Sequence, residues 1–124
     1  MRDIKFRAYD YENKRFEYDV QDTYDEEIGS SFLNVLEDDR FVVEQYTGIK
    51  DMNDVEIYEG DIIKFHVVML SPDDKVGYVK YYPEYGYSIM LPLGRVLRQE
   101  YWASGDKHTI EVVGNIHEDE ELLN

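Results

Sequence analysis

Short segments rich in β-branched and aromatic residues recur along this chain, and turn residues interrupt them about every ten positions. Roughly seven or eight such segments fit into the 124 residues, which is the length of one domain with a single core. This rhythm predicts one mainly β domain over residues 1–124, either a small barrel or a sandwich. We find no internal repeat, linker or low-complexity tract that would argue for another architecture.

Residues 45–65 (QYTGIKDMNDVEIYEGDIIKF) show the pattern most clearly. Thr47 and Gly48 carry turn chemistry, and so do residues 51–54 and 59–61, because Gly tolerates positive φ and Asp or Asn bonds to its own backbone. Residues 55–58 alternate between apolar and polar, as a half-buried strand does, and residues 62–70 form the most apolar predicted strand. Residues 60–91 read like the meander of a small SH3-like barrel.

The rest of the chain predicts further strands and one or two short helices. Residues 32–36 fit a helix capped by Ser30 or Ser31, or equally a strand. Residues 95–102 are ambiguous in the same way, and residues 119–123 predict one helical turn with its leucines packed on the sheet. Polar turns are expected at 10–14, 71–74, 83–86 and 103–107. The other predicted strands cover residues 2–9, 15–20, 40–46, 75–82, 87–91 and 108–116.

Three blocks of this sequence resemble the YopX family of phage and prophage proteins, in the same order and with the same spacing. They are residues 2–10, residues 46–65, and residues 111–118 with two leucines behind them. Met52 and Asp54 stand where a lysine and a glycine are common in the family, and residues 118–121 lack the usual proline. The resemblance implies a small mainly β protein without an established activity. The central motif residues are Tyr46, Thr47, Gly48, Asp51, Ile57, Tyr58, Gly60 and Asp61.

The charge balance bears on partners, because 28 acidic residues face 13 basic ones and the net charge is −15. A field of that sign repels phosphate backbones, so we expect no direct binding to nucleic acid. It leaves room for a basic partner, a divalent cation or mimicry of DNA, and it also serves solubility alone. Nine of the acids fall in residues 3–27, while the others are scattered among lysines, which disfavours an elongated mimic.

The compartment is predicted from what the sequence lacks. Cysteine is absent, which excludes a disulfide framework, a thiol nucleophile and a Cys-ligated zinc site, and which fits a reducing cytosol. The chain is charged from Arg2 onward and has no apolar run near the length of a membrane span. We therefore expect a cytoplasmic protein with no membrane contact.

No catalytic, cofactor-binding or metal-ligating residue is assigned. The histidines, His66, His108 and His117, have no metal-site spacing, and a surface or half-buried position explains them better. Residues 72–75 (Pro-Asp-Asp-Lys) contain both halves of the PD and D-x-K motif of metal-dependent nucleases. The two halves overlap in one segment instead of lying on neighbouring strands, so we interpret the segment as a turn. No serine lies in a nucleophile elbow, and no glycine-rich loop matches a phosphate or dinucleotide site. Catalysis and a cofactor are therefore not expected.

The tyrosines point to a protein interface instead. Five of them lie in a ten-residue stretch around one predicted hairpin, which is more than such a hairpin can bury. Tyrosine gives an interface large contact area at low entropy cost. The sequence thus predicts a non-catalytic interaction protein that self-associates into a homo-oligomer through a tyrosine-rich face or an edge strand. The alternatives are an acidic DNA mimic and a metal-dependent hydrolase. The predicted interface residues are Tyr78, Tyr81, Tyr82, Tyr85 and Tyr87.

Overall fold

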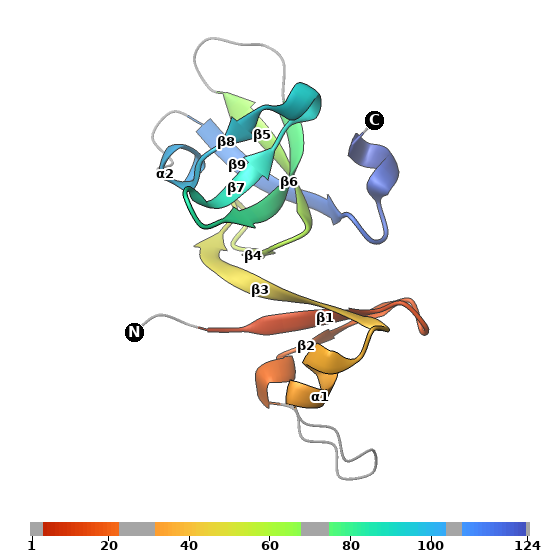
Figure 1. Ribbon diagram of the computed structural model, residues 1–124. Coiled ribbons are helices and arrows are strands. Elements are labelled where there is room, and N and C mark those ends of the chain that lie inside the picture. The colour runs from red at the N-terminus through yellow and green to blue at the C-terminus, as the bar shows by residue number, and fades with distance from the viewer. Residues whose placement is uncertain (1–3, 23–31, 68–74, 104–107, 124) are drawn as a thin grey trace. The chain divides into compact units, whose positions relative to one another are not determined.

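A computed structural model of the protein describes residues 4–22, 32–67, 75–103 and 108–123, and it confirms the mainly β fold (Figure 1). The chain forms two compact units, Met1–Tyr46 and Thr47–Asn124. Strand β3 (Phe41–Lys50) begins in the first unit and ends in the second. The described helices are two short α-helices, α1 and α2, and three 3₁₀ turns, η1 to η3.

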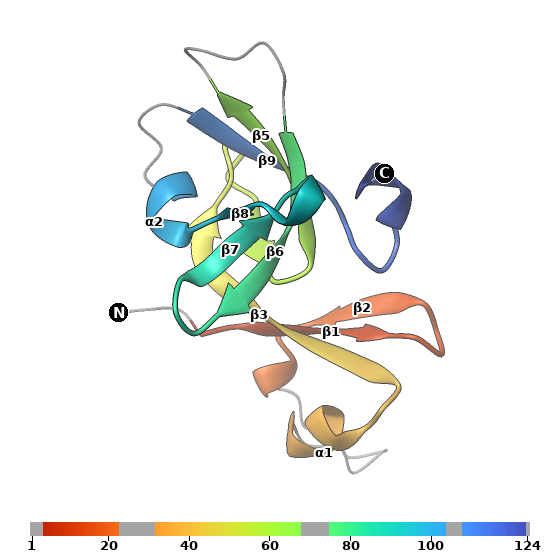
Figure 2. The ribbon, with the colours of Figure 1, turned by 45° about the horizontal axis from the view of Figure 1, so that its top comes forward.

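The first unit is a β-hairpin extended by β3 and backed by short helices. Strand β1 (Phe6–Asp10) pairs antiparallel with β2 (Arg15–Tyr18) and with β3 (Figure 2). With β4 (Glu56–Tyr58) they form a sheet of order β2-β1-β3-β4. Turn η1 (Val20–Asp22) and helix α1 (Phe32–Glu37) follow. Ala8 from β1, Val20 and Val35 form its buried apolar cluster, which resolves the ambiguity at 32–36 in favour of a helix.

The β1–β2 turn is closed by a buried carboxylate. Asp10 is 2% exposed, and its Oδ1 accepts hydrogen bonds from the backbone N–H groups of Glu12 (2.9 Å) and Asn13 (3.1 Å). Its Oδ2 accepts a third bond from the Asn13 amide, at 2.8 Å. Burial alone would raise the pKa of Asp10, but these hydrogen bonds, together with the charge of Arg40, outweigh it and lower the pKa from 3.8.

This lowered pKa predicts a pH dependence of stability. A carboxyl whose pKa is depressed by folding stabilises the folded state above its unfolded pKa, and the contribution disappears as pH falls through the folded pKa. We expect Asp10→Asn to lower the free energy of unfolding by a constant amount between about pH 5 and 7, and the difference to shrink below about pH 4. Urea titrations of both proteins across this range measure it. A difference that grows toward low pH would contradict the assignment.

The second unit is built on an antiparallel five-stranded sheet, of order β8-β7-β6-β5-β9, which curls into a half-barrel (Figure 1). Because β5 to β8 lie in sequence order, they form the meander expected from residues 60–91. Strand β9 returns to pair with the free edge of β5. The strands are β4 (Glu56–Tyr58), β5 (Asp61–Val67), β6 (Lys75–Tyr82), β7 (Gly86–Met90), β8 (Val96–Leu97) and β9 (His108–Asn115).

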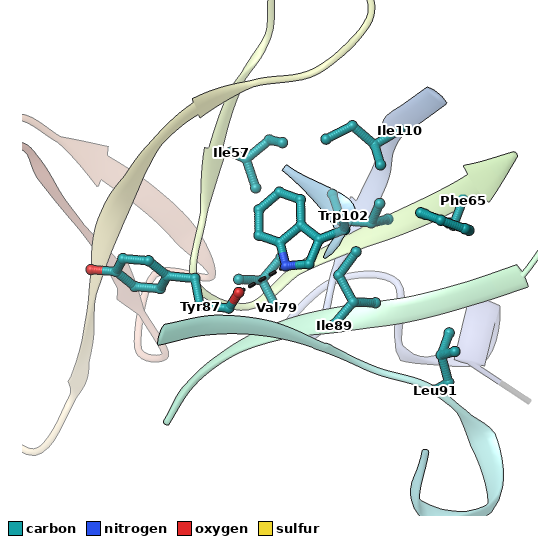
Figure 3. Packing of buried hydrophobic residues seen from close by; sticks show 9 residues of the cluster. Ile57, Phe65, Val79, Tyr87, Ile89, Leu91, Trp102 and Ile110 are labelled. Carbon is teal, nitrogen blue, oxygen red and sulfur yellow. Dashed lines mark hydrogen bonds between the residues drawn. The ribbon is translucent and has the colours of Figure 1, made fainter. Parts of the chain in front are cut away.

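The core of this unit surrounds Trp102, which ends helix α2 (Gln99–Trp102) and is 1% exposed. Its indole packs among Ile57, Ile89 and Ile110, and its Nε1 donates a 2.8 Å hydrogen bond to the Tyr87 carbonyl (Figure 3). The ambiguous residues 95–102 therefore contain both structures: a two-residue strand and then one helical turn. Turns η2 (Pro92–Gly94) and η3 (Glu120–Leu123) complete the unit.

Several predicted boundaries require correction. The turn expected at Thr47 and Gly48 is not formed, because β3 continues through both residues to Lys50. The first strand starts at Phe6, so residues 4 and 5 are not part of it, and residues 2 and 3 of the predicted strand lie outside the described residues. The second strand ends at Tyr18 rather than at residue 20. The predicted strand end at 68–70 and the predicted turn at 71–74 lie outside the described residues, as does most of the turn at 103–107. The helical turn at 119–123 is confirmed as η3.

Candidate interaction surface

The central motif is built around Asp51, whose buried carboxylate joins two distant segments. Its Oδ1 accepts hydrogen bonds from the backbone N–H groups of Asn53 (2.8 Å) and Val55 (2.9 Å), which closes the predicted turn. Its Oδ2 accepts a 2.8 Å bond from the N–H of Val112 on β9. The Met52 N–H also donates to the Ile110 carbonyl, at 2.9 Å. The turn thus satisfies part of the exposed edge of β9.

Asp51 is therefore expected to contribute strongly to stability. Asp51→Ala leaves three backbone donors without their acceptor, and we expect it to lower the free energy of unfolding by about 2–3 kcal/mol. Asp51→Asn keeps one good acceptor oxygen and should cost about half as much. Chemical denaturation measures both changes. Equal stability of the alanine variant and the natural protein would show that water replaces these bonds.

The other motif residues also support the backbone. Asp61 is 3% exposed, and its Oδ2 accepts a 2.8 Å bond from the Tyr58 N–H across the β4–β5 turn. Gly48 and Gly60 have φ of 87° and 82°, a region that disfavours any residue with a Cβ. Four further motif residues are buried. They are Tyr46, Thr47, Ile57 and Tyr58. The structure thus gives all eight a folding role, and none of them lines the surface described below.

Asp54 occupies the turn position where the family commonly has glycine, and its φ is 66°. Its carboxylate is 83% exposed and lies 3.6 Å from the Lys50 ammonium, a pair that contributes little. Because an aspartate at positive φ is strained while glycine is not, we expect Asp54→Gly to raise the free energy of unfolding by about 0.5 kcal/mol. Asp54→Val should lower it. Thermal melts of the two variants give opposite shifts if the backbone conformation is the cause.

The β6–β7 hairpin divides the five predicted interface tyrosines between its two faces. Tyr81 lies opposite Tyr87, on the side of the sheet that carries Val79, and their rings are 5.1 Å apart. Tyr87 is buried there, so its ring belongs to the core. By strand alternation, Tyr78 and Tyr82 lie on the opposite face. The structure therefore does not gather the five residues into one patch.

A smaller aromatic group lies at the tip of the hairpin. The rings of Tyr82 and Tyr85 are 6.3 Å apart, and Tyr85 is 42% exposed in the β6–β7 turn. The Arg98 guanidinium stacks 4.5 Å from the Tyr85 ring, and the Lys80 ammonium lies 5.3 Å from the Tyr82 ring. We call these four residues the hairpin tip. It combines rigid aromatic area with two cations, which is the composition typical of contact surfaces between proteins.

Two further features bear on ion binding. Among the described residues, no group of three or more His, Cys, Asp or Glu side chains could hold a metal ion. His66 is half-buried, and its Nε2 lies 3.9 Å from the Glu111 carboxylate on the neighbouring strand. The PD of residues 72–73 lies outside the described part of the chain, and so does the His108 side chain.

The second unit also contains an apolar groove of about 440 Å³ that the sequence does not predict. It lies where η2 and η3 approach the start of β6, three segments far apart in the sequence. The only local signal was the Pro92-Leu93-Gly94 turn, which leaves Leu93 96% exposed. The lining residues are Lys75, Val76, Leu91, Pro92, Leu93, Arg95, Leu122 and Leu123.

None of the helices in the described residues is both long and apolar enough to cross a bilayer. The fold is similar to two solved structures. Protein EF1440 from Enterococcus faecalis is 24% identical, with a TM-score of 0.62 over 98% of this chain and 99% of that one. Protein YopX from Bacillus subtilis is 17% identical, with a TM-score of 0.61 over 97% and 98%.

A search of curated proteins finds no match to this chain. The family model of the YopX protein, in contrast, matches residues 5–124 and so spans both compact units. It covers all three sequence blocks on which the resemblance was based, except for the first residues of the first block. The chain therefore belongs to the YopX family.

Proposed function

We propose that this protein is a non-catalytic, self-associating interaction module of phage or prophage origin that acts in the host cytosol. The hairpin tip carries the proposal. Tyr82 and Tyr85 present aromatic area with little rotamer freedom, and the cations of Lys80 and Arg98 lie over their rings. Exposed aromatic and arginine side chains of this kind supply most of the binding free energy in protein interfaces.

The charge of the molecule supports a second copy as the occupant of this surface. Lys80 and Arg98 are two of only 13 basic residues in the chain, and they lie together at the hairpin tip. A chain with a net charge of −15 offers carboxylates to them from many positions on its own surface. Local attraction at the tip therefore opposes the general repulsion between two acidic copies.

Light scattering after size exclusion tests this proposal. We expect the natural protein to be a homo-oligomer and the double variant Tyr82→Ser/Tyr85→Ser to have a smaller mass. The matched control, Tyr11→Ser/Tyr101→Ser, removes two more exposed rings elsewhere and should keep the natural mass. A monomeric natural protein at millimolar concentration would overturn self-association. Loss of the oligomer only in the control would move the contact away from the hairpin tip.

A pull-down from host lysate, carried out with the same purified protein, distinguishes self-association from DNA mimicry. A mimic would be recovered from host lysate with a DNA-binding protein, and added duplex DNA would release that protein by competition. Self-association predicts that duplex DNA leaves the mass of the assembly unchanged. Release of a captured partner by DNA, together with a monomeric mass, would replace the present proposal by mimicry.

A further inference from the structure

The groove between η2, η3 and β6 is lined mostly by apolar side chains, and one of them projects into solvent. Leu91 is buried, and Leu122 and Leu123 of η3 belong to the same lining. Leu93 also lines the groove and is 96% exposed, more than any other large apolar side chain in the described residues. Figure 2 shows the C-terminal turn η3 beside β6. A hollow and a knob of the same chemical character thus lie next to each other.

The backbone at the knob is held in an unusual conformation. Leu93 has φ 65° and ψ 24°, between Pro92 and Gly94, although a residue with a Cβ disfavours this left-handed region. The side chain gains no burial in return, because it points into solvent. Strain at an exposed apolar residue, with nothing among the described residues that benefits from it, suggests a contact with something outside the chain.

The charges around the groove are of both signs and are separated. Lys75 and Arg95 line the groove itself, while Glu120 and Glu121 lie on η3 next to Leu122 and Leu123. A 3₁₀ turn places residues i and i+3 on the same side, so Glu120 shares the side of Leu123. Within the described part of the chain, none of these four charged groups forms an ion pair. The surface therefore carries opposite charges that are unused.

We infer that this groove binds a second copy of the same chain in a two-fold contact. A two-fold interface requires a patch that is complementary to itself, and both properties of this patch meet that requirement. Leu93 of one copy enters the groove of the other, and the acidic η3 of one copy faces Lys75 and Arg95 of the other. A foreign acidic peptide would satisfy the cations but would leave Leu93 and the two glutamates without a partner.

This inference rests on the proposed self-association and adds a contact separate from the hairpin tip. Two different self-contacts on one chain build an assembly larger than a dimer. Removing either contact alone should therefore leave a smaller assembly rather than a monomer. For the groove, we expect loss of the two-fold contact to halve the mass of the natural assembly.

Charge reversal tests the groove directly. One variant carries Lys75→Glu/Arg95→Glu, and a second carries Glu120→Lys/Glu121→Lys. Each makes the facing charges alike, so each alone should have half the natural mass in light scattering. In an equimolar mixture every facing pair is again opposite, because one chain is acidic at both positions and the other is basic at both. The mixture should recover the natural mass, with one chain of each kind in every pair.

Two controls keep the test independent of folding and of net charge. Lys14→Glu/Arg15→Glu makes the same change in net charge as Lys75→Glu/Arg95→Glu, but on exposed residues of the first unit, and should keep the natural mass. Leu93→Asn removes the knob without unfolding the turn, because asparagine tolerates positive φ, and it should also halve the mass. Fluorescence of Trp102 reports whether each variant retains the core of the second unit.

The outcomes separate the two proposals. If both charge variants and Leu93→Asn keep the natural mass, the groove contact is wrong and the hairpin tip stands. If the charge variants halve the mass but the Tyr82/Tyr85 variant does not reduce it, the groove stands and the hairpin tip is wrong. Failure of the mixture to recover the natural mass, after each variant alone has lost it, overturns the two-fold arrangement.

Discussion

Arg7→Ala is expected to lower the free energy of unfolding by about 3–5 kcal/mol, because it removes the guanidinium that faces the buried Glu44 carboxylate. The two residues face each other across β1 and β3, with the Arg7 Nε 3.0 Å from the Glu44 Oε1. Their side chains are only 4% and 6% exposed. The guanidinium also stacks 4.3 Å from the Phe16 ring, so the substitution removes packing as well as charge.

Removing both charges of the pair should cost much less stability than removing Arg7 alone. The double variant Arg7→Met/Glu44→Leu replaces both charges by apolar groups of similar length, and we expect it to recover most of the lost stability. The exposed pair Arg15–Glu17 on β2 has a similar distance, 2.9 Å, and provides the control. Arg15→Ala should change stability by less than about 1 kcal/mol. Urea denaturation of the four proteins gives the comparison, and a mild effect of Arg7→Ala would mean that water reaches Glu44.

Trp102→Ala is expected to have a comparable effect on the second unit, about 3–5 kcal/mol. The indole is buried among the isoleucines of β4, β7 and β9, and alanine would leave a cavity that three strands and a helix border. The hydrogen bond to the Tyr87 carbonyl would be lost as well. Trp102→Phe keeps most of the apolar volume and should cost about half as much. Equal effects of the two substitutions would assign the stability to the hydrogen bond rather than to packing.

Trp102 is the single tryptophan of the chain, so its fluorescence follows the second unit alone, whereas far-UV circular dichroism follows both. Coincident transitions would show that the two units unfold together, as one domain does. In that case Arg7→Ala would shift the fluorescence transition although the substitution lies in the first unit. Separate transitions would instead give Arg7→Ala no effect on fluorescence.

Most strands were predictable from sequence because their signals are local. Residues 75–82 and 108–116 alternate correctly and end at turn residues, and both form strands close to these bounds. The error at Thr47 and Gly48 has a physical cause: a glycine at positive φ is compatible with a turn and also with an irregular strand, and pairing decides between them. Residues 95–102 were ambiguous between strand and helix for a similar reason, because tertiary packing decides between the two. Trp102 lies in a helix and its indole fills the core.

The candidate surfaces were less predictable. The density of tyrosines predicts an interface on the whole β6–β7 hairpin, but alternation along β6 and β7 sends Tyr82 and Tyr87 to different faces, which composition does not show. The groove was invisible in the sequence because Lys75, Leu93 and Leu122 meet only after folding. Asp51 was identified as a turn residue, but its bond to Val112 depends on a contact between segments 61 residues apart.

The acidic residues of this chain are of two kinds, buried and exposed, and we expect selection to act on them differently. Asp10, Asp51 and Asp61 each accept hydrogen bonds from the backbone, so their carboxylates belong to the turns. Exposed acids such as Glu84 and Glu100 carry no such constraint. The overall acidity can therefore drift during evolution, even toward neutrality, without loss of the fold. Substitution rates across relatives should be low at the three aspartates and high at the exposed acids, whatever the net charge of each relative.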